Sequence, residues 1–165
     1  WDIDKYMESI PFINNDKSNV NWYFLRYADV LLMYAEALNE WHHGPNNAAL
    51  AALNMVRRRG YGLPYNEANT TVDLKSTSYE GFQEYIRNER AYELAFEGNR
   101  RQDLIRWGIY YETIVNTYIK LIGWYPEANY VAYQYTQKNK HELLPIPARD
   151  MSLMENFKQN QGWGD

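Results

Sequence analysis

Residues 22–38 read WYFLRYADVLLMYAEAL, and this stretch decides the fold class. Its apolar residues recur at the i, i+3, i+4, i+7 spacing of an α-helix, and they fall on two faces. One face is formed by Ala28, Leu31, Leu32, Ala35 and Leu38. The other face is formed by Val30, Met33, Tyr34 and Ala37. A helix that is apolar nearly all round must be covered on both sides. The sequence therefore predicts a core helix here.

A second helix is expected after the interruption at His42-His43-Gly44-Pro45, with Pro45 suited to its first position. Its apolar face is marked by Ala49, Ala52, Leu53 and Val56. Arg57, Arg58 and Arg59 fall in its last turn, where the helix dipole favours cations, and Gly60 ends it. The two helices predict a helical hairpin over residues 21–60, preceded by an irregular lead-in at 1–20. The spacing is similar to a single tetratricopeptide-type unit.

Further helices are predicted downstream, separated by long loops. Residues 61–76 are rich in Gly, Pro, Asn and Thr and predict a loop, and a capping box at 77–80 predicts a helix over 78–97. A shorter helix starts at Asn99 and closes at Gly108, so that residues 77–108 hold two helices. Residues 109–165 are expected to hold one helix, over 111–122, and aromatic-rich loops. Alternation at Val131, Tyr133 and Tyr135 predicts one short strand in these loops. The fold class expected is all-α, mainly helical with long loops.

Composition excludes several classes of function. The chain has 165 residues, which suits one domain or a large part of one. Seventeen basic residues against 21 acidic ones argue against a nucleic-acid partner. The lack of cysteine excludes disulfides, thiol catalysis and Cys-ligated zinc. Sixteen Tyr and six Trp accompany a mean hydropathy of −0.69. Such amphipathic rings suit surfaces that are apolar yet wet, including sugar- and protein-binding faces.

Residues 86–108, IRNERAYELAFEGNRRQDLIRWG, carry the densest charge. Paired carboxylates could serve as acid and base in glycoside hydrolysis, but each one here has an arginine three or four residues away that favours the ionised form. We therefore expect a structural ion network that ties adjacent helices together. Its members are Arg90, Glu93, Glu97, Arg100, Arg101, Asp103 and Arg106. His42, His43 and His141 lack metal-ligand spacing, and no phosphate loop or nucleophile elbow is present, so we expect no catalytic residue, metal or cofactor.

Four ordered blocks resemble the C-terminal part of the SusD/RagB-like family, the outer-membrane nutrient-binding lipoproteins of Bacteroidetes. They are LRYADVLLMYAEA at 25–37, ALAALNMVRRRG at 49–60, the charged stretch at 86–108, and the pair LPIP at 144–147 with QNQGW at 159–163. Gln161 departs from the usual proline, and Tyr61-Gly62 stands where an alanine and a glycine usually follow the arginines. Family members are several times longer. Residues 1–165 are therefore expected to be the C-terminal region of a longer chain.

The resemblance implies a tetratricopeptide-like helical scaffold and a surface-exposed protein of the outer membrane, anchored by an N-terminal lipid outside this chain. Such a protein captures an oligosaccharide, or a peptide, and delivers it to a SusC-like TonB-dependent transporter without catalysis. Any ligand-binding residues here are expected in the aromatic segment after Gly123. They are Trp124, Tyr125, Tyr130, Tyr133 and Tyr135. These rings could instead pack over the helices. Two other functions stay open: a helical-repeat adaptor that binds proteins and no carbohydrate, and a glycoside hydrolase that uses Glu93 or Glu97.

Overall fold

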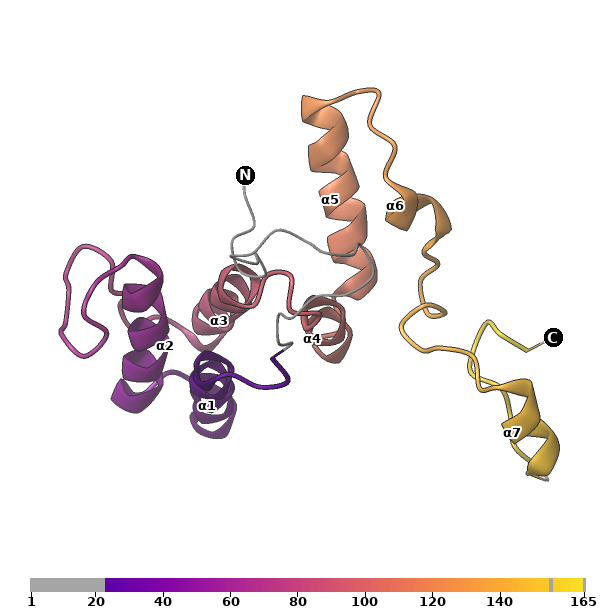
Figure 1. Ribbon diagram of the computed structural model, residues 1–165, viewed down its shortest axis with the longest axis horizontal. Coiled ribbons are helices and arrows are strands. Elements are labelled where there is room, and N and C mark those ends of the chain that lie inside the picture. Colours follow the sequence, from indigo (N-terminus) through magenta and orange to yellow (C-terminus); the bar gives the residue numbers. More distant parts are fainter. Residues whose placement is uncertain (1–22, 155, 165) are drawn as a thin grey trace, which may run out of the picture. The chain divides into compact units, whose positions relative to one another are not determined.

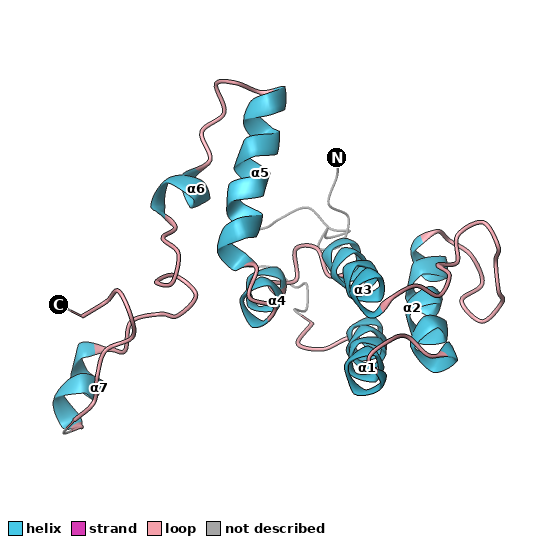
Figure 2. Cartoon of the chain, turned by 180° about the vertical axis from the view of Figure 1, so that it is seen from behind, coloured by secondary structure: helices cyan, strands magenta, loops and turns pink. Residues whose placement is uncertain are grey.

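The computed structural model describes residues 23–154 and 156–164, and every regular element in these ranges is an α-helix (Figures 1 and 2). The all-α prediction is confirmed. The lead-in predicted for 1–20 lies outside the described residues. The chain divides after Glu97 into two compact units, with helices α1–α3 in the first and α4–α7 in the second. Each unit is described by itself below.

The first unit consists of α1 (Tyr27–His42), α2 (Asn47–Gly60) and α3 (Tyr79–Glu93), and each of these helices contacts the other two. Four of the residues buried on α1 and α2 are alanines, whose small side chains suit close packing of two helices. The buried apolar residues are Ala28, Leu32, Ala35, Ala49, Ala52, Leu53, Val56, Phe82, Ile86 and Leu94. The predicted hairpin therefore forms, and α3 completes its core.

Only one of the two apolar faces of α1 is covered within the described residues. Leu32 and Ala35 are fully buried against α2 and α3, whereas Val30, Met33 and Tyr34 on the other face are exposed. The predicted two-sided burial is thus observed on one side.

The two ends of α2 are set by local hydrogen bonds. The side chain of Asn46 accepts from Ala49 N at 2.9 Å, so Asn46 is the N-cap and the helix begins at Asn47. The prediction that Pro45 occupies the first helical position is wrong, because the capping amide lies after the proline. Gly60 ends the helix as predicted.

The loop 61–78 is tied to α2 by side chains rather than by secondary structure. Asn54 donates from Nδ2 to Leu74 O at 3.0 Å and accepts from Leu74 N at 2.8 Å. Arg57 donates from Nε to Val72 O at 2.6 Å, and Arg58 makes a bidentate pair with Asp73. Two of the three arginines that the sequence assigned to the helix dipole therefore fix a loop.

Helix α3 is shorter than predicted. The Ser78 hydroxyl caps it by accepting from Gly81 N at 3.1 Å, in the predicted place. The helix ends at Glu93 instead of Glu97, and a turn follows in which Phe96 takes a φ of 64°. A left-handed backbone at a bulky residue is costly and incompatible with a continuing helix, which accounts for the early end.

The second unit contains α4 (Arg100–Arg106), α5 (Tyr110–Trp124), α6 (Val131–Tyr135) and α7 (Ala148–Leu153). Leu104 and Ile114 are buried, and α5 contacts both α4 and α6. Gly108, at φ 70°, closes α4 as predicted, with Ile109 N bonded to Leu104 O at 3.0 Å.

The short strand predicted around Val131, Tyr133 and Tyr135 is wrong: this segment is α6. Gln134 N and Thr136 N bond to carbonyls four residues earlier, at Tyr130 and Ala132. A strand needs a partner strand for its backbone groups, and none exists within the described residues. The helical turn satisfies those groups locally instead.

The two parts of the last sequence block, LPIP at 144–147 and QNQGW at 159–163, meet in the second unit. The amide of Gln159 accepts from Ile146 N at 2.7 Å and donates to Ile146 O at 2.9 Å, and Asn160 Nδ2 donates to Leu144 O at 2.7 Å. The Trp163 indole N–H donates to the Lys140 and Leu143 carbonyls. The extended LPIP segment is therefore held by Gln159 and Asn160, here called the QN pair, whose side chains form hydrogen bonds with its backbone.

Candidate functional site

The first unit contains a lattice of arginines and carboxylates between its three helices. Arg26, just before α1, donates to Glu97 Oε1 at 2.7 Å and Oε2 at 3.0 Å, and to Glu93 Oε1 at 2.7 Å. Arg90 of α3 donates to Asp29 Oδ1 of α1 at 2.6 Å. Arg57 and Arg59 of α2 pair with α3, at Glu89 and Glu93 respectively. These pairs join all three helices.

The electrostatics of this lattice fit a structural role. The hydrogen bond to Glu97 raises the pKa of Arg26 above its ordinary value, against the opposing effect of burial. Burial raises the pKa of the Glu89 carboxyl, while the bond from Arg57 opposes that shift. A carboxylate that accepts hydrogen bonds from a guanidinium is poorly suited to donate a proton in catalysis. The arrangement braces the helices.

The predicted network members fall into two groups. Arg90, Glu93 and Glu97 belong to the lattice of the first unit. The other four lie in the second unit, where Arg106 pairs with Asp103 at 3.0 Å. Arg101 Nη2 donates to the backbone carbonyl of His141 at 2.7 Å, and the Arg100 guanidinium lies 6.0 Å from the Trp107 ring centre.

Several lattice members were not predicted. They are Arg26, Asp29, Arg57, Arg59 and Glu89. The sequence does show charged residues within apolar stretches, and this could have indicated buried ion pairs. Arg26 and Asp29 flank the start of the core helix, and Glu89 lies on the buried stripe of α3. A charge at such a position needs a partner, which the sequence does not identify.

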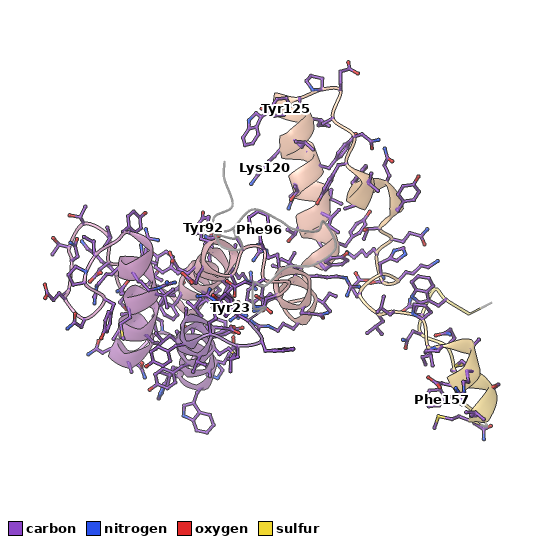
Figure 3. All side chains as sticks on the ribbon, in the orientation of Figure 1. Tyr23, Tyr92, Phe96, Lys120, Tyr125 and Phe157 are labelled. Atoms are coloured by element: carbon purple, nitrogen blue, oxygen red, sulfur yellow. The ribbon has the colours of Figure 1, made fainter. Side chains whose placement is uncertain are left out.

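The five predicted ligand-binding rings lie at the end of α5 and around α6. Trp124 is the last residue of α5 and is exposed. Tyr125 follows it and is also exposed, at the end of α5 (Figure 3). Tyr130 precedes α6 and is half-buried. Tyr133 stacks on Tyr118 of α5, with ring centres 4.0 Å apart and planes within 9°. Tyr135, at the end of α6, is exposed. Trp124, Tyr125 and Tyr135 are thus exposed, whereas Tyr133 packs on α5, and the role of these rings in ligand binding stays a prediction.

At least two cavities are lined by described residues of the first unit. One of about 450 Å³ lies between α1 and α2, with Tyr27, Leu31 and Met55 among its mostly apolar lining. The other, of about 380 Å³, lies at the end of α2 against α3 and is lined by Tyr61 and Tyr92 together with lattice members. Both volumes fall in the range of small-molecule sites.

Comparison with protein-family models matches the SusD family over residues 3–163. The chain belongs to the SusD family. SusD-like protein P25 of Formosa agariphila is 34% identical over 167 residues, which cover 99% of this chain and 28% of that protein. SusD-like protein P2 of the same organism is 30% identical over 151 residues, covering 89% of this chain and 26% of that protein.

The crystal structure of a SusD homolog from Bacteroides thetaiotaomicron is also similar to this chain. It aligns with a TM-score of 0.83 and 56% sequence identity, over 99% of this chain and 31% of that one. This SusD-family chain therefore spans less than a third of the length of the relatives it matches.

The SusD-like blocks are physically connected in the structure. Arg26 and Asp29 of the RYAD block bind the signature block 86–108. The QN pair binds LPIP. In the described part of the chain, no three His, Cys, Asp or Glu residues lie where they could hold a metal ion, and no helix is long and apolar enough to cross a bilayer.

Proposed function

We propose that this chain is part of a cell-surface nutrient-binding protein that captures an oligosaccharide and delivers it to a SusC-like TonB-dependent transporter without catalysis. Membership of the SusD family supports this class of protein. The observation that carries the ligand class is the exposure of Trp124, Tyr125 and Tyr135 around α5 and α6.

The chemistry of these rings suits a sugar. The indole and phenol rings combine a broad apolar face with a polar edge, so they can stack on the C–H face of a pyranose while water reaches its hydroxyls. Tyr133 has one face covered by Tyr118, which leaves it a supporting role beside the exposed rings.

The test is isothermal titration calorimetry on the full-length protein with neutral hexasaccharides of glucose, mannose and xylose. The double variant Trp124→Ala/Tyr125→Ala should raise the Kd about 5- to 150-fold, since each aromatic contact contributes about 0.5–1.5 kcal/mol. Trp41→Ala is the matched control, because Trp41 is an exposed indole in the first unit. An unchanged Kd in the double variant, with a melting temperature equal to that of wild type, would show that these rings do not bind the ligand.

The absence of catalysis is a further part of the proposal. Glu93 and Glu97, the two acids that a hydrolase mechanism would use, both accept hydrogen bonds from Arg26. Bound hexasaccharides should therefore show no new reducing ends after prolonged incubation with the protein. Release of reducing sugar that disappears in Glu97→Gln would establish a hydrolase instead.

The partner and the location are tested in cells. The full-length protein should co-purify with a TonB-dependent transporter after mild detergent extraction of the outer membrane, and it should incorporate labelled palmitate. Protease added to intact cells should degrade it. Recovery from the cytosolic fraction without lipid would contradict the proposal.

A second candidate is a helical-repeat adaptor with no carbohydrate ligand. The uncovered face of α1, with Val30, Met33 and Tyr34 exposed in the described chain, favours it. The calorimetric titration separates the two functions. If the chain is an adaptor, titration with any of the hexasaccharides should produce no heat. Titration with a mixture of nutrient peptides should produce no heat either.

A further inference from the structure

The smaller cavity of the first unit, about 380 Å³, combines aromatic rings with fixed polar groups. It lies where the end of α2 meets α3, far along the chain from the aromatic segment of the second unit. The residues that matter in its lining are Arg57, Tyr61, Glu89, Tyr92 and Glu93.

Two tyrosine rings line this cavity while remaining largely in solvent. Tyr61, the residue after α2, is 60% exposed, and Tyr92 is 73% exposed. Tyr92 lies on α3 (Figure 3). The Arg57 guanidinium carbon lies 5.2 Å from the Tyr61 ring centre, so the guanidinium covers one face of that ring. Rings held at the surface in this way offer an apolar platform with a polar edge.

The polar wall of the cavity is held rigidly. Arg57 donates from Nε to Val72 O and from Nη1 to Glu89 Oε1. The Glu89 side chain is only 8% exposed. Its second oxygen, Oε2, accepts no hydrogen bond from the described part of the chain. The wall thus presents an acceptor fixed before any ligand arrives, which reduces the entropy lost on binding.

The charges around the cavity balance. Arg57 pairs with Glu89, Arg59 pairs with Glu93, and Arg26 bonds to Glu93 and Glu97. Each charged group that lines the cavity, Arg57, Glu89 and Glu93, is therefore paired with an opposite charge. Such a surface gives no electrostatic preference for an acidic or a basic ligand, so hydrogen bonding and stacking decide what binds.

We propose that this cavity is a second carbohydrate subsite, which takes one neutral sugar residue between Tyr61 and Tyr92 with its hydroxyls against Glu89 and Arg57. The ligand class rests on the proposed function, while the location rests on the cavity itself. A sugar residue presents an apolar C–H face to the rings and hydroxyl donors to the free carboxylate oxygen.

The test is calorimetry on the full-length protein with the same neutral glucose, mannose and xylose hexasaccharides and with hexagalacturonate. We expect two sites per chain for the hexasaccharide that binds. Tyr61→Ala/Tyr92→Ala should remove one site, or weaken it at least tenfold, and Tyr61→Phe/Tyr92→Phe should retain it. Tyr65→Ala is the matched control, because Tyr65 is an exposed ring of the same unit that lines the other cavity.

The outcomes separate this subsite from the proposed function. Heat from no oligosaccharide overturns both. Binding that is lost only in Trp124→Ala/Tyr125→Ala overturns the subsite and leaves the function standing. Binding that is lost only in Tyr61→Ala/Tyr92→Ala supports the subsite and shows that Trp124 and Tyr125 do not bind the oligosaccharide. Preference of the Tyr61–Tyr92 site for hexagalacturonate overturns the neutral ligand class.

Discussion

The ion pair between Arg90 and Asp29 offers a quantitative test of the lattice as a brace. Arg90 Nη1 lies 2.6 Å from Asp29 Oδ1, and the two side chains are 5% and 12% exposed. Arg90→Met keeps much of the side-chain volume but removes the charge, so the Asp29 carboxylate stays at a buried site without its guanidinium. Loss of one partner of a buried pair lowers the free energy of unfolding by about 3–5 kcal/mol.

The size of this effect follows from burial. At about 4 Å, two unit charges attract by about 1 kcal/mol in water and about 4 kcal/mol at an effective dielectric constant near 20. The Arg90–Asp29 pair belongs to the second regime. The pair between Lys138 and Glu112, with both side chains about half exposed, belongs to the first. Lys138→Met is therefore the control, and its stability should match wild type within experimental error.

The assay is urea-induced unfolding of the full-length protein, followed by far-ultraviolet circular dichroism. Asp29→Leu and the double variant Asp29→Leu/Arg90→Met complete the cycle, and the double variant should recover much of the loss because no buried charge of the pair remains. A loss below about 1 kcal/mol in Arg90→Met, the range of surface pairs, would refute the reasoning. Additive losses in the double variant would refute it equally.

Three further substitutions test single contacts. The hydrogen bond from Arg58 lowers the pKa of the Asp73 carboxyl below its ordinary value of 3.8. The pair therefore stabilises the fold fully above pH 3.8, and this stabilisation is lost as the pH falls through the pKa of Asp73 in the folded state. Asp73→Asn should flatten the acid side of a stability-versus-pH curve, and an unchanged curve would contradict this. Asn54→Ala removes both bonds to Leu74 and should cost about 2 kcal/mol in urea unfolding, with faster hydrogen exchange at the Leu74 amide; unchanged exchange would count against it. Gly108→Ala should cost about 1 kcal/mol in the same assay from backbone strain alone, since φ is +70° and no atom lies within 4 Å of an added Cβ. A loss above about 3 kcal/mol would point to a steric clash instead.

Local signals in the sequence predicted the helices well. The 3.6-residue spacing of Leu32 and Ala35 located α1, Ser78 located the start of α3, and Gly108 located the end of α4. These features act within a few residues along the chain, so a sequence displays them directly. The failures lay where a local pattern was short, as at α6, where two-residue alternation over five residues is equally compatible with a helical turn.

The candidate sites were harder to predict because their members come from distant segments. The sequence singled out Glu93 and Glu97, but their partner Arg26 lies 67 and 71 residues away. The pattern likewise indicated exposed rings after Gly123 but not the stacking of Tyr133 on Tyr118, which requires α6 to fold back on α5. The cavity between Tyr61 and Tyr92 had no sequence signal beyond the departure at Tyr61-Gly62.

The sequence by itself determined the all-α class, the helical hairpin and the SusD-like motifs, because periodicity, caps and turn residues depend on neighbours within about one helical turn. Only the tertiary structure decided which arginine meets which carboxylate, how the QN pair holds LPIP, and which tyrosines share a cavity. Those contacts depend on how whole helices pack, and a charge takes as its partner whatever packing brings within reach.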